Sequence, residues 1–478
     1  MSDIKVPLVI RGEVIEDYEL EFGNRSANGI TFETPNVEKY IRSLVNTDPN
    51  SLLDLYTISL EDIYSYLHEL GDRLNFDKNK RVREAFEVSC YFSNLSRSVL
   101  ESVYRNCFVF FNRSTLREIV ENGIGSQYLE GWVPRQLLDG STISIRAIGA
   151  RGVHVIAGNI PIVAAMTFMR SAITRSDTIV KLPSNDPLTA VTIAREAIEM
   201  APDHPITKHF SVAYWKGGDE KVESQIYAAN NIEKICAWGG YASIKHISKY
   251  LGPGIDLVTL DPKSSLTLIG KEALKDEETM RSVARRVATD VGSMDQEACS
   301  NARIIFLESG TAASGVAKAN QFGQYVYEAI QTLPPSISAG PVSFDHALLA
   351  EIQAILPLTD YYKVYTERNQ INKSGAIIVS QLGEQVDFVK LLYGRVGNLI
   401  PVDDIRDAIR YFSAATQTVG IYPDSLRTEL RDRAAIAGGQ RFIPVGYASG
   451  GGVRAMPPDG IEPERRMCKW ISDRHIPA

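Results

Sequence analysis

Gly152-Val153-His154-Val155-Ile156-Ala157-Gly158 is an apolar run that ends in glycine, which is typical of a buried strand. The apolar segment 160–172 follows it, and we expect a helix there because Pro161 suits the first helical turn. Thr178-Ile179-Val180-Lys181-Leu182 is then a second buried strand. A strand, a helix and another strand in this spacing predict a parallel sheet.

The same alternation continues further along the chain. A helix is predicted over 188–200, and strands are predicted over 210–215 and 234–238. Each of these two strands is followed closely by a pair of glycines. The pattern predicts a doubly wound parallel sheet.

The flanking regions indicate more than one domain. Residues 4–34 are typical of short strands, and residues 36–125 carry apolar side chains at helical spacing. From about residue 256, strands and helices alternate again, and a glycine-rich tail follows them. We predict a first domain with its N-terminal region over 1–258, a second domain over 259–435, and a C-terminal segment, 436–478, that packs back on the first domain.

Composition excludes several classes of protein. The chain has 478 residues, 44% hydrophobic and 23% charged, with a formal net charge of −7. This length exceeds what one hydrophobic core supports. The negative charge and the lack of a basic run argue against nucleic-acid binding. The N-terminus has no secretory pattern and no apolar run approaches about 18 residues, so we expect no membrane insertion.

The five cysteines are scattered and form no CxxC pair, so neither a disulfide framework nor a zinc ribbon is expected. This usage indicates a reducing compartment, and we expect a cytoplasmic protein. The histidines show no metal-ligand spacing, so no metal site is predicted. The chain has no Walker A motif and no GxGxxG after an N-terminal strand. The loose GxGxxA at 450–455 lacks a following helix, and we interpret it as a loop.

Cys299 is the main candidate for chemistry. It lies in Ser293-Met294-Asp295-Gln296-Glu297-Ala298-Cys299-Ser300-Asn301-Ala302-Arg303, between a charged helical run and the apolar strand 304–307. A thiol at such a junction can be held in a cleft beside backbone N–H groups, which is what a cysteine nucleophile and its oxyanion require. The alternative is an inert cysteine packed beside a strand, which is our interpretation of Cys236.

Four segments that follow strands point to a cofactor. Asn159 lies at the mouth of the first predicted helix, and Lys181 lies at the end of a strand, where open α/β sheets bind ligands. Gly217 and the pair Gly239-Gly240 follow later strands, and the pair opens a helix whose N-terminus attracts phosphate. Each segment taken alone has an ordinary alternative: a helix cap, a surface lysine or a simple turn.

In this order, the segments resemble the aldehyde dehydrogenase superfamily. The resemblance implies that Asn159 and the N–H of Cys299 bind an oxyanion, that Lys181 contacts the adenosine ribose, and that Gly239 and Gly240 lie near the pyrophosphate. Gln296-Glu297-Ala298-Cys299 is similar to the catalytic-cysteine signature of the superfamily. The implied fold is α/β, with two doubly wound parallel-sheet domains, a helical N-terminal region and an oligomerisation extension. The resemblance also implies a homo-oligomer, either a dimer or a tetramer.

The chain departs from the superfamily pattern in two places, and these differences limit the reactions that we expect it to catalyse. Its hydrolytic members carry a general-base glutamate in Glu-Leu-Gly-Gly-Lys, whereas the matching stretch here is Thr259-Leu260-Asp261-Pro262-Lys263. Without that base, a thioester on Cys299 would exchange with a thiol or be reduced rather than be hydrolysed. The ribose-binding glutamate of the superfamily is also missing around 391–395.

The expected cofactor is NADPH. Ser184 lies where many NAD-preferring relatives have a glutamate that opposes the 2′-phosphate of NADPH. NADH remains the alternative, because Asp186 is nearby.

A closer resemblance is to the LuxC-type acyl-CoA reductases, the fatty-acid reductase component of bacterial luminescence and its relatives. It rests on the segments 157–161, 235–240 and 295–300 and on a tail that comprises 438–441 and 459–467. It implies NADPH-dependent reduction of a fatty acyl-CoA to an aldehyde through a cysteine-bound acyl-enzyme, with acyl-CoA or an acyl-transferring synthetase as the partner. A CoA-acylating aldehyde dehydrogenase working in the oxidative direction and a non-catalytic nucleotide-binding scaffold are the alternatives. A thiol hydrolase is a third, although the sequence pairs no histidine with Cys299.

Overall fold

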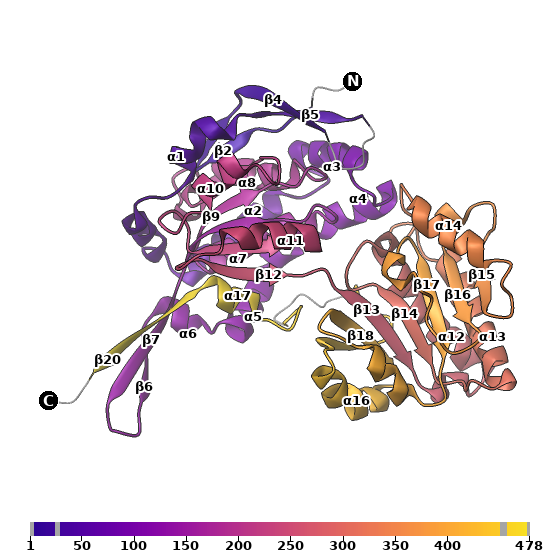
Figure 1. Ribbon diagram of the computed structural model, residues 1–478. Helices are drawn as coiled ribbons and strands as arrows, with labels where there is room; N and C mark the ends of the chain where they lie inside the picture. Colours follow the sequence, from indigo (N-terminus) through magenta and orange to yellow (C-terminus); the bar gives the residue numbers. More distant parts are fainter. Residues whose placement is uncertain (1–3, 24–28, 450–456, 476–478) are drawn as a thin grey trace.

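The computed structural model describes residues 4–23, 29–449 and 457–475. The predicted strand–helix–strand unit is present as β8 (Arg151–Val155), α7 (Ile162–Ile173) and β9 (Asp177–Lys181). These strands belong to a seven-stranded sheet of order β12-β11-β8-β9-β10-β2-β3 (Figure 1). Its other members are β10 (Phe210–Ala213), β11 (Lys234–Trp238), β12 (Asp256–Leu260), β2 (Leu8–Ile10) and β3 (Glu13–Ile15).

The winding of this sheet reverses beside β8. The chain passes from β8 outward to β9 and β10, and then returns to the other side of β8 for β11 and β12. All neighbours from β12 to β10 are parallel. The carboxyl ends of β8 and β11 therefore flank a topological switch point, where open α/β sheets bind their ligands.

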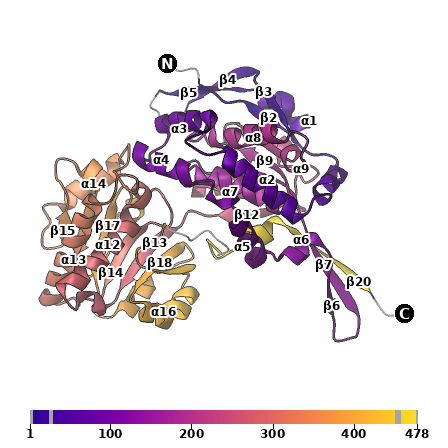
Figure 2. The same cartoon turned by 180° about the vertical axis from the view of Figure 1, so that it is seen from behind.

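Helices cover both faces of the first sheet. Figure 2 shows α2 (Leu60–Arg73) and α4 (Arg97–Asn106) on the same side as α7. The side chain of Ser59 accepts a hydrogen bond from the N–H of Asp62, and the Asp62 carboxylate accepts one from the N–H of Ser59, so that α2 begins with a capping box. The buried side chains of α2 join a core with α3 (Lys80–Phe92), α5 (Arg113–Gly123) and α8 (Thr189–Met200). A separate core on the opposite face includes α1 (Ile41–Leu44), α10 (Glu220–Ile226) and α11 (Tyr241–Ile247).

The second domain contains another seven-stranded sheet, of order β15-β16-β17-β14-β13-β18-β19. Only the edge strand β15 is antiparallel to its neighbour. α12 (Glu277–Gly292) and α13 (Ala313–Gln331) pack on one face, and η8 (Ile405–Tyr411) and α16 (Asp424–Ile436) pack on the other. The strands are β13 (Ser264–Ile269), β14 (Ala302–Leu307), β15 (Tyr362–Tyr365), β16 (Ala376–Ser380), β17 (Val396–Pro401), β18 (Thr416–Tyr422) and β19 (Arg441–Pro444).

An antiparallel sheet of β6 (Val133–Gln136), β7 (Thr142–Ile148) and β20 (Lys469–His475) projects from the first domain (Figure 1). It forms the extension that the resemblance implied. A smaller sheet of β1 (Ile4–Lys5), β5 (Thr31–Pro35) and β4 (Tyr18–Gly23) covers the N-terminal side. The remaining α-helices are α6 (Ser126–Glu130), α9 (Pro205–Lys208), α14 (His346–Ile355), α15 (Ile371–Ser374) and α17 (Pro463–Met467).

Two predicted domain boundaries need correction. The boundary between 258 and 259 would divide β12, which pairs with β11 through Leu260. The boundary at 435/436 lies before β19, which still pairs with β18 of the second sheet. Pairing registers decide both points, and they are not visible in a single segment. The loose GxGxxA at 450–455 lies outside the described residues. No helix among the described residues is long and apolar enough to cross a membrane.

Candidate active site

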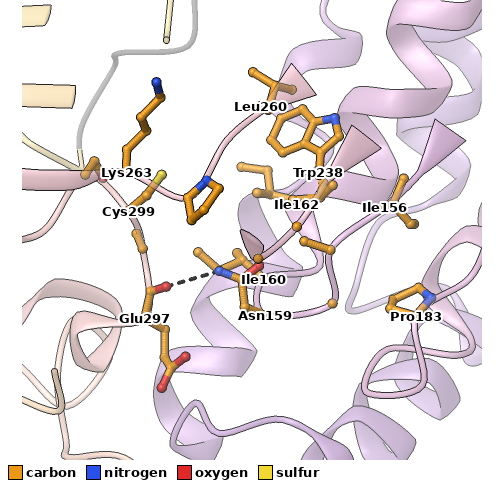
Figure 3. Close-up of a pocket in the computed structure, with 18 of the residues that line it drawn as sticks. Ile156, Asn159, Ile160, Ile162, Pro183, Trp238, Leu260, Lys263, Glu297 and Cys299 are labelled. Atoms are coloured by element: carbon orange, nitrogen blue, oxygen red, sulfur yellow. Dashed lines mark hydrogen bonds between the residues drawn. The ribbon is translucent and has the colours of Figure 1, made fainter. Parts of the chain in front are cut away.

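A cleft of about 1060 Å³ lies between the two domains. The first domain contributes the loop after β8 and the glycine pair after β11, which are the two sides of the switch point. The second domain contributes the loop that carries Cys299, together with Gln417 of β18 and Arg441 of β19. Cys299 and Asn159 therefore meet in one cavity although they belong to different domains (Figure 3).

The loop before Cys299 has an unusual backbone. Met294, Asp295 and Gln296 all have left-handed conformations, with φ values of 51°, 51° and 67°. Such residues cost about 1–3 kcal/mol each and persist only where the surroundings hold them in place. The buried amide of Gln296 donates to the carbonyls of Ala302 and Val396, at 2.9 and 2.8 Å, and accepts from the N–H of Val396 at 2.8 Å. These bonds fasten the loop to two strands of the second sheet.

Asp295 holds the loop from the other side. Its fully buried carboxylate accepts hydrogen bonds from the backbone N–H groups of Ala339 at 2.7 Å and Gly340 at 2.8 Å. Its second oxygen accepts from the N–H of Ser96 at 2.9 Å, at the start of α4. Asn94 of the same connection donates to the Glu297 carboxylate at 2.5 Å. The N-terminal helical region thus binds directly to the cysteine loop.

The Cys299 side chain is open to the cleft, so the alternative of an inert cysteine sealed in packing does not fit the structure. Gln417 donates to its sulfur over 3.2 Å, and Ser265 donates to its carbonyl over 2.7 Å. Surrounding protein atoms and the charge of Asp459 raise the pKa of Cys299, while the hydrogen bond from Gln417 and the charges of Arg303 and Arg441 oppose that rise.

Other cysteines lie in different surroundings. Cys107, Cys236 and Cys468 are buried. Burial raises the pKa of Cys236 to about 12, and it does the same for Cys468. Both remain protonated thiols at neutral pH, which supports the prediction that Cys236 is inert.

Asn159 faces the cysteine loop from the first domain. Its side-chain amide donates to the carbonyl of Glu297 over 3.1 Å, and Figure 3 shows that the Glu297 carboxylate points away from this contact. The backbone N–H of Cys299 has no acceptor within the described part of the chain. The N–H of Cys299 and the amide of Asn159 are the two donors that an oxyanion site at this sulfur would use.

The opposite end of the cleft brings together the residues predicted to bind a cofactor. Lys181, Gly217, Gly239 and Gly240 all line it. A Cβ added at Gly217 or Gly240 would meet no protein atom within 4 Å, so these positions leave open space that a side chain would fill. Together with the switch point, this space fits a dinucleotide.

Ser184 lies on the loop that follows β9. Its neighbours Pro183 and Asn185 line the cleft, but Ser184 does not. Asn185 also packs against Gly158, where a Cβ would lie 2.3 Å from its side-chain oxygen. The carboxylate of Asp186 is buried and accepts from the hydroxyl of Thr189 at 2.5 Å. Asp186 is therefore bound within the first domain.

Sequence reasoning missed several residues of the site. Thr259 does not line the cleft, but Leu260, Asp261 and Lys263 do. Two acidic residues, Asp261 and Asp459, line the same cleft as Cys299. No motif marks Gln417 or Arg303. Arg441 and Asp459 lie in tail segments that carried part of the family resemblance, which is the one signal that could have found them.

The cleft has an apolar wall, to which Met294 of the cysteine loop belongs. Its members come from α4, from α7 with the loop before it, and from the cysteine loop with the segment after α13; they are Val99, Val103, Ile160, Val163, Met166, Met294 and Ile337. Val99, Ile160, Val163 and Met166 are buried. Such a wall suits an aliphatic chain because it offers no polar groups that the chain would leave without partners.

Two other kinds of site would need either metal ligands or a histidine base. Among the described residues, no cluster of three or more histidine, cysteine, aspartate or glutamate side chains could hold a metal. The cleft-lining histidine, His246, binds Glu223 at 2.5 Å at the nucleotide end. Within the described chain, no histidine forms a hydrogen bond to Cys299, so the thiol-hydrolase alternative has no base of that kind.

Comparison with known proteins places this chain in a family. The sequence model described as "Acyl-CoA reductase (LuxC)" matches residues 55–470. The chain belongs to this family. It is 27% identical over 479 residues to the long-chain acyl-protein thioester reductase of Aliivibrio fischeri, covering 98% of this chain and 92% of that protein.

Solved structures show how this LuxC-family chain is folded. A lactaldehyde dehydrogenase matches with a TM-score of 0.74 at 12% identity, covering 99% of this chain and 100% of that one. The NADP-dependent glyceraldehyde-3-phosphate dehydrogenase of Bacillus halodurans C-125, solved with NADP, has a TM-score of 0.72 at 13% identity and covers 99% of each chain. The fold is that of the aldehyde dehydrogenase superfamily, as the sequence predicted.

Proposed function

We propose that this protein reduces a fatty acyl thioester to an aldehyde through an acyl group bound to Cys299, with NADPH as the reductant. The observation that carries the proposal is the position of the Cys299 thiol. It opens into an interdomain cleft that holds Asn159 on the facing wall and an open, glycine-lined space at the other end. The family supports the reaction class.

Acyl transfer needs a nucleophile and a binding site for the oxyanion. Cys299 supplies the sulfur, and attack on the thioester carbonyl converts that oxygen into an oxyanion. The N–H of Cys299 and the amide of Asn159 are the donors that stabilise it, and loss of one such donor typically costs about 2.7–4 kcal/mol of barrier height. The donor thiol leaves, and the acyl group stays on Cys299.

Lys181, Gly217, Gly239 and Gly240 would hold the cofactor. When bound, a nicotinamide cofactor supplies the hydride for reduction. The residues of this chain position the acyl group and release the product, because Cys299 must leave as a thiolate to free the aldehyde.

The acyl donor is a fatty acyl-CoA or an acyl group carried by a partner protein. The apolar wall of the cleft supports a fatty chain over a short polar one. The relative from Aliivibrio fischeri is named for an acyl-protein thioester. Both donors present the same thioester to the sulfur.

We propose NADPH rather than NADH because of the charges of the residues around Ser184. The carboxylate of Asp186, the one acid near Ser184 in sequence, is bound to Thr189. Ser184 itself carries no charge to oppose a 2′-phosphate. Higher kcat/KM with NADH than with NADPH would reverse this choice.

We further propose a homo-oligomer built through the β6–β7–β20 extension. Trp132, Leu138 and Ile471 are exposed on or beside it, and apolar surface of this kind favours association. Light scattering on the purified protein should give a dimer or tetramer mass; a monomer at micromolar concentration would reject the proposal.

Mass spectrometry of the intact protein after mixing with palmitoyl-CoA, without cofactor, tests the acyl-enzyme. We expect an acyl adduct that is absent in Cys299→Ala and present in Cys236→Ala, the matched control. An adduct that persists in Cys299→Ala would reject the mechanism. NADPH binding without any adduct would favour the scaffold alternative.

The direction of the reaction is tested separately. NADPH oxidation should be measured with acyl-CoAs from acetyl to palmitoyl, and NADP reduction with the matching aldehyde and free CoA. We expect reduction of long acyl chains to have the higher kcat/KM. Faster oxidation of aldehydes would favour the CoA-acylating alternative.

A further inference from the structure

A chain of hydrogen bonds in the second domain ends at the catalytic sulfur. Arg441 of β19 donates from Nε to the hydroxyl oxygen of Thr418 over 3.0 Å, and the Thr418 hydroxyl donates to Oε1 of Gln417 over 3.3 Å. Nε2 of Gln417 donates to the Cys299 sulfur over 3.2 Å and also to the carboxylate of Asp459. Thr418 and Gln417 lie next to each other on β18.

These contacts determine the orientation of the amide. Arg441 can only donate, so the Thr418 hydroxyl oxygen accepts from it and the hydroxyl hydrogen points toward the Gln417 carbonyl oxygen. The amide nitrogen of Gln417 carries two hydrogens. The carboxylate of Asp459 accepts one of them, and the sulfur of Cys299 accepts the other. The two N–H bonds of Gln417 are therefore directed at Cys299 and Asp459, because a flipped amide would place its oxygen against the Asp459 carboxylate.

The geometry points to Gln417 as a further catalytic residue, whose N–H stabilises the Cys299 thiolate, with Asp459 as the positioning residue that holds the amide in this orientation. This inference rests on the proposed function, since it assigns a role to the thiolate of the same reaction. The thiolate is needed twice, when the sulfur attacks the thioester and when it leaves the reduced product. A donor directed at the sulfur favours both steps without any proton transfer.

Asp459 has two opposing effects on the sulfur. Its negative charge raises the pKa of Cys299, whereas its bond to Gln417 holds the donor that lowers it. Other charged groups also affect the pKa values of Cys299 and Asp459. Their effects stay the same when only Gln417 or Asp459 is changed. These groups are Arg303 of β14, Arg441 of β19, Arg170 of α7, and Asp261 and Lys263 between β12 and β13.

Alkylation of Cys299 by iodoacetamide measures the thiolate directly, without acyl donor or cofactor. The full-length protein is treated across a range of pH, and the modified Cys299 peptide is quantified by mass spectrometry. Gln417→Met removes both N–H donors at similar volume. We expect the pKa of Cys299 to rise by about one to two units, with alkylation near pH 7 roughly 10- to 100-fold slower.

Gln381→Met is the matched control. Gln381 also donates within the second domain, to Asn320 and to the carbonyl of Val379, but it does not line the cleft. Its substitution should leave the alkylation profile unchanged. Gln417→Glu is the second variant in case the methionine disturbs packing. It keeps the shape and puts a carboxylate at the sulfur, so the pKa of Cys299 should rise as well.

Asp459 is tested by a double-mutant cycle. Asp459→Asn removes the charge but keeps an oxygen that can accept from Gln417, so the pKa of Cys299 should fall below the wild-type value. Asp459→Ala removes the charge and the anchor, so the pKa should be higher than in Asp459→Asn. If Asp459 acts through Gln417, this difference between the two variants disappears in the Gln417→Met background.

An unchanged pKa of Cys299 in folded Gln417→Met would overturn the role of Gln417. An equal difference between Asp459→Asn and Asp459→Ala in both backgrounds would overturn the positioning role. Neither result depends on acyl transfer. If wild-type protein forms no acyl adduct while Gln417→Met still shifts the pKa, the proposed function and the catalytic role of Gln417 fail, and only its stabilisation of the Cys299 thiolate stands.

Discussion

Replacement of Asp295 with alanine would remove the acceptor of three backbone N–H groups, those of Ser96, Ala339 and Gly340. A hydrogen bond to a charged group is worth about 1.5–3 kcal/mol, so three bonds would sum to about 5–9 kcal/mol. Water and relaxing neighbours recover part of that sum. We therefore expect the free energy of unfolding to fall by about 3–5 kcal/mol.

Replacement of Asp295 with asparagine distinguishes the stabilisation from hydrogen bonds within the second domain from that of the hydrogen bond to the first domain. One oxygen of Asp295 accepts from Ala339 and Gly340 within the second domain, and the other accepts from Ser96 at the start of α4. The amide of Asp295→Asn can keep the first pair, but its NH₂ group then faces the N–H of Ser96. One buried donor left without an acceptor costs about 1–3 kcal/mol.

Urea unfolding followed by circular dichroism measures both variants, with the free energy extrapolated linearly to water. Asp407→Ala, which changes an exposed acid of η8, serves as the control and should lie within about 0.5 kcal/mol of wild type. An Asp295→Ala protein within 1 kcal/mol of wild type, roughly the scatter of such measurements, would refute the assigned role of the carboxylate. Equal losses in the alanine and asparagine variants would refute its division between the domains.

Three other predictions concern separate parts of the molecule. Burial lowers the pKa of His209, but the hydrogen bond and charge of Asp177, with the charge of Asp54, outweigh it and raise the pKa above 6.5. Protonated His209 therefore stabilises the folded protein below about pH 6.5, and this stabilisation is lost as the pH rises through the folded-state pKa of His209. The urea concentration at the unfolding midpoint should fall more in His209→Gln near pH 6 than near pH 9. Gly240→Val should keep the wild-type melting temperature but weaken NADPH binding by at least about tenfold in a fluorescence titration, because its side chain enters open cleft space. Val103→Trp should lower kcat/KM for palmitoyl-CoA relative to acetyl-CoA by about tenfold or more, because Val103 lies in the apolar wall; an unchanged ratio would exclude this wall as the acyl site.

Local patterns explain why much of the fold could be predicted. β11 spans Lys234–Trp238, the same residues as the predicted strand, and α7 spans Ile162–Ile173 where the prediction was 160–172. Cys299 and Asn159 could be identified because each lies in a short segment that resembles a known family. Lys181 could be placed because the carboxyl end of a buried strand is a local feature.

Residues brought to the site by pairing could not be predicted in this way. Gln417 reaches the sulfur because β18 lies beside β13, whose Ser265 binds the carbonyl of Cys299. Asp459 reaches Gln417 from a turn just before α17, outside any helix or strand that a periodic pattern could predict. The domain boundaries failed at β12 and β19 for a related reason, since a strand belongs to the sheet with which it pairs.

The amino-acid order by itself determined which segments become strands and helices, and it singled out the cysteine, because apolar spacing and short motifs act over a few neighbouring residues. Only the tertiary structure decided which strand ends converge on the cleft and which side chains contact the sulfur. The physical reason is that these contacts join residues far apart in the chain, such as Gln417 and Cys299, separated by 118 positions. Their proximity follows from sheet order and domain packing, which depend on the whole chain at once.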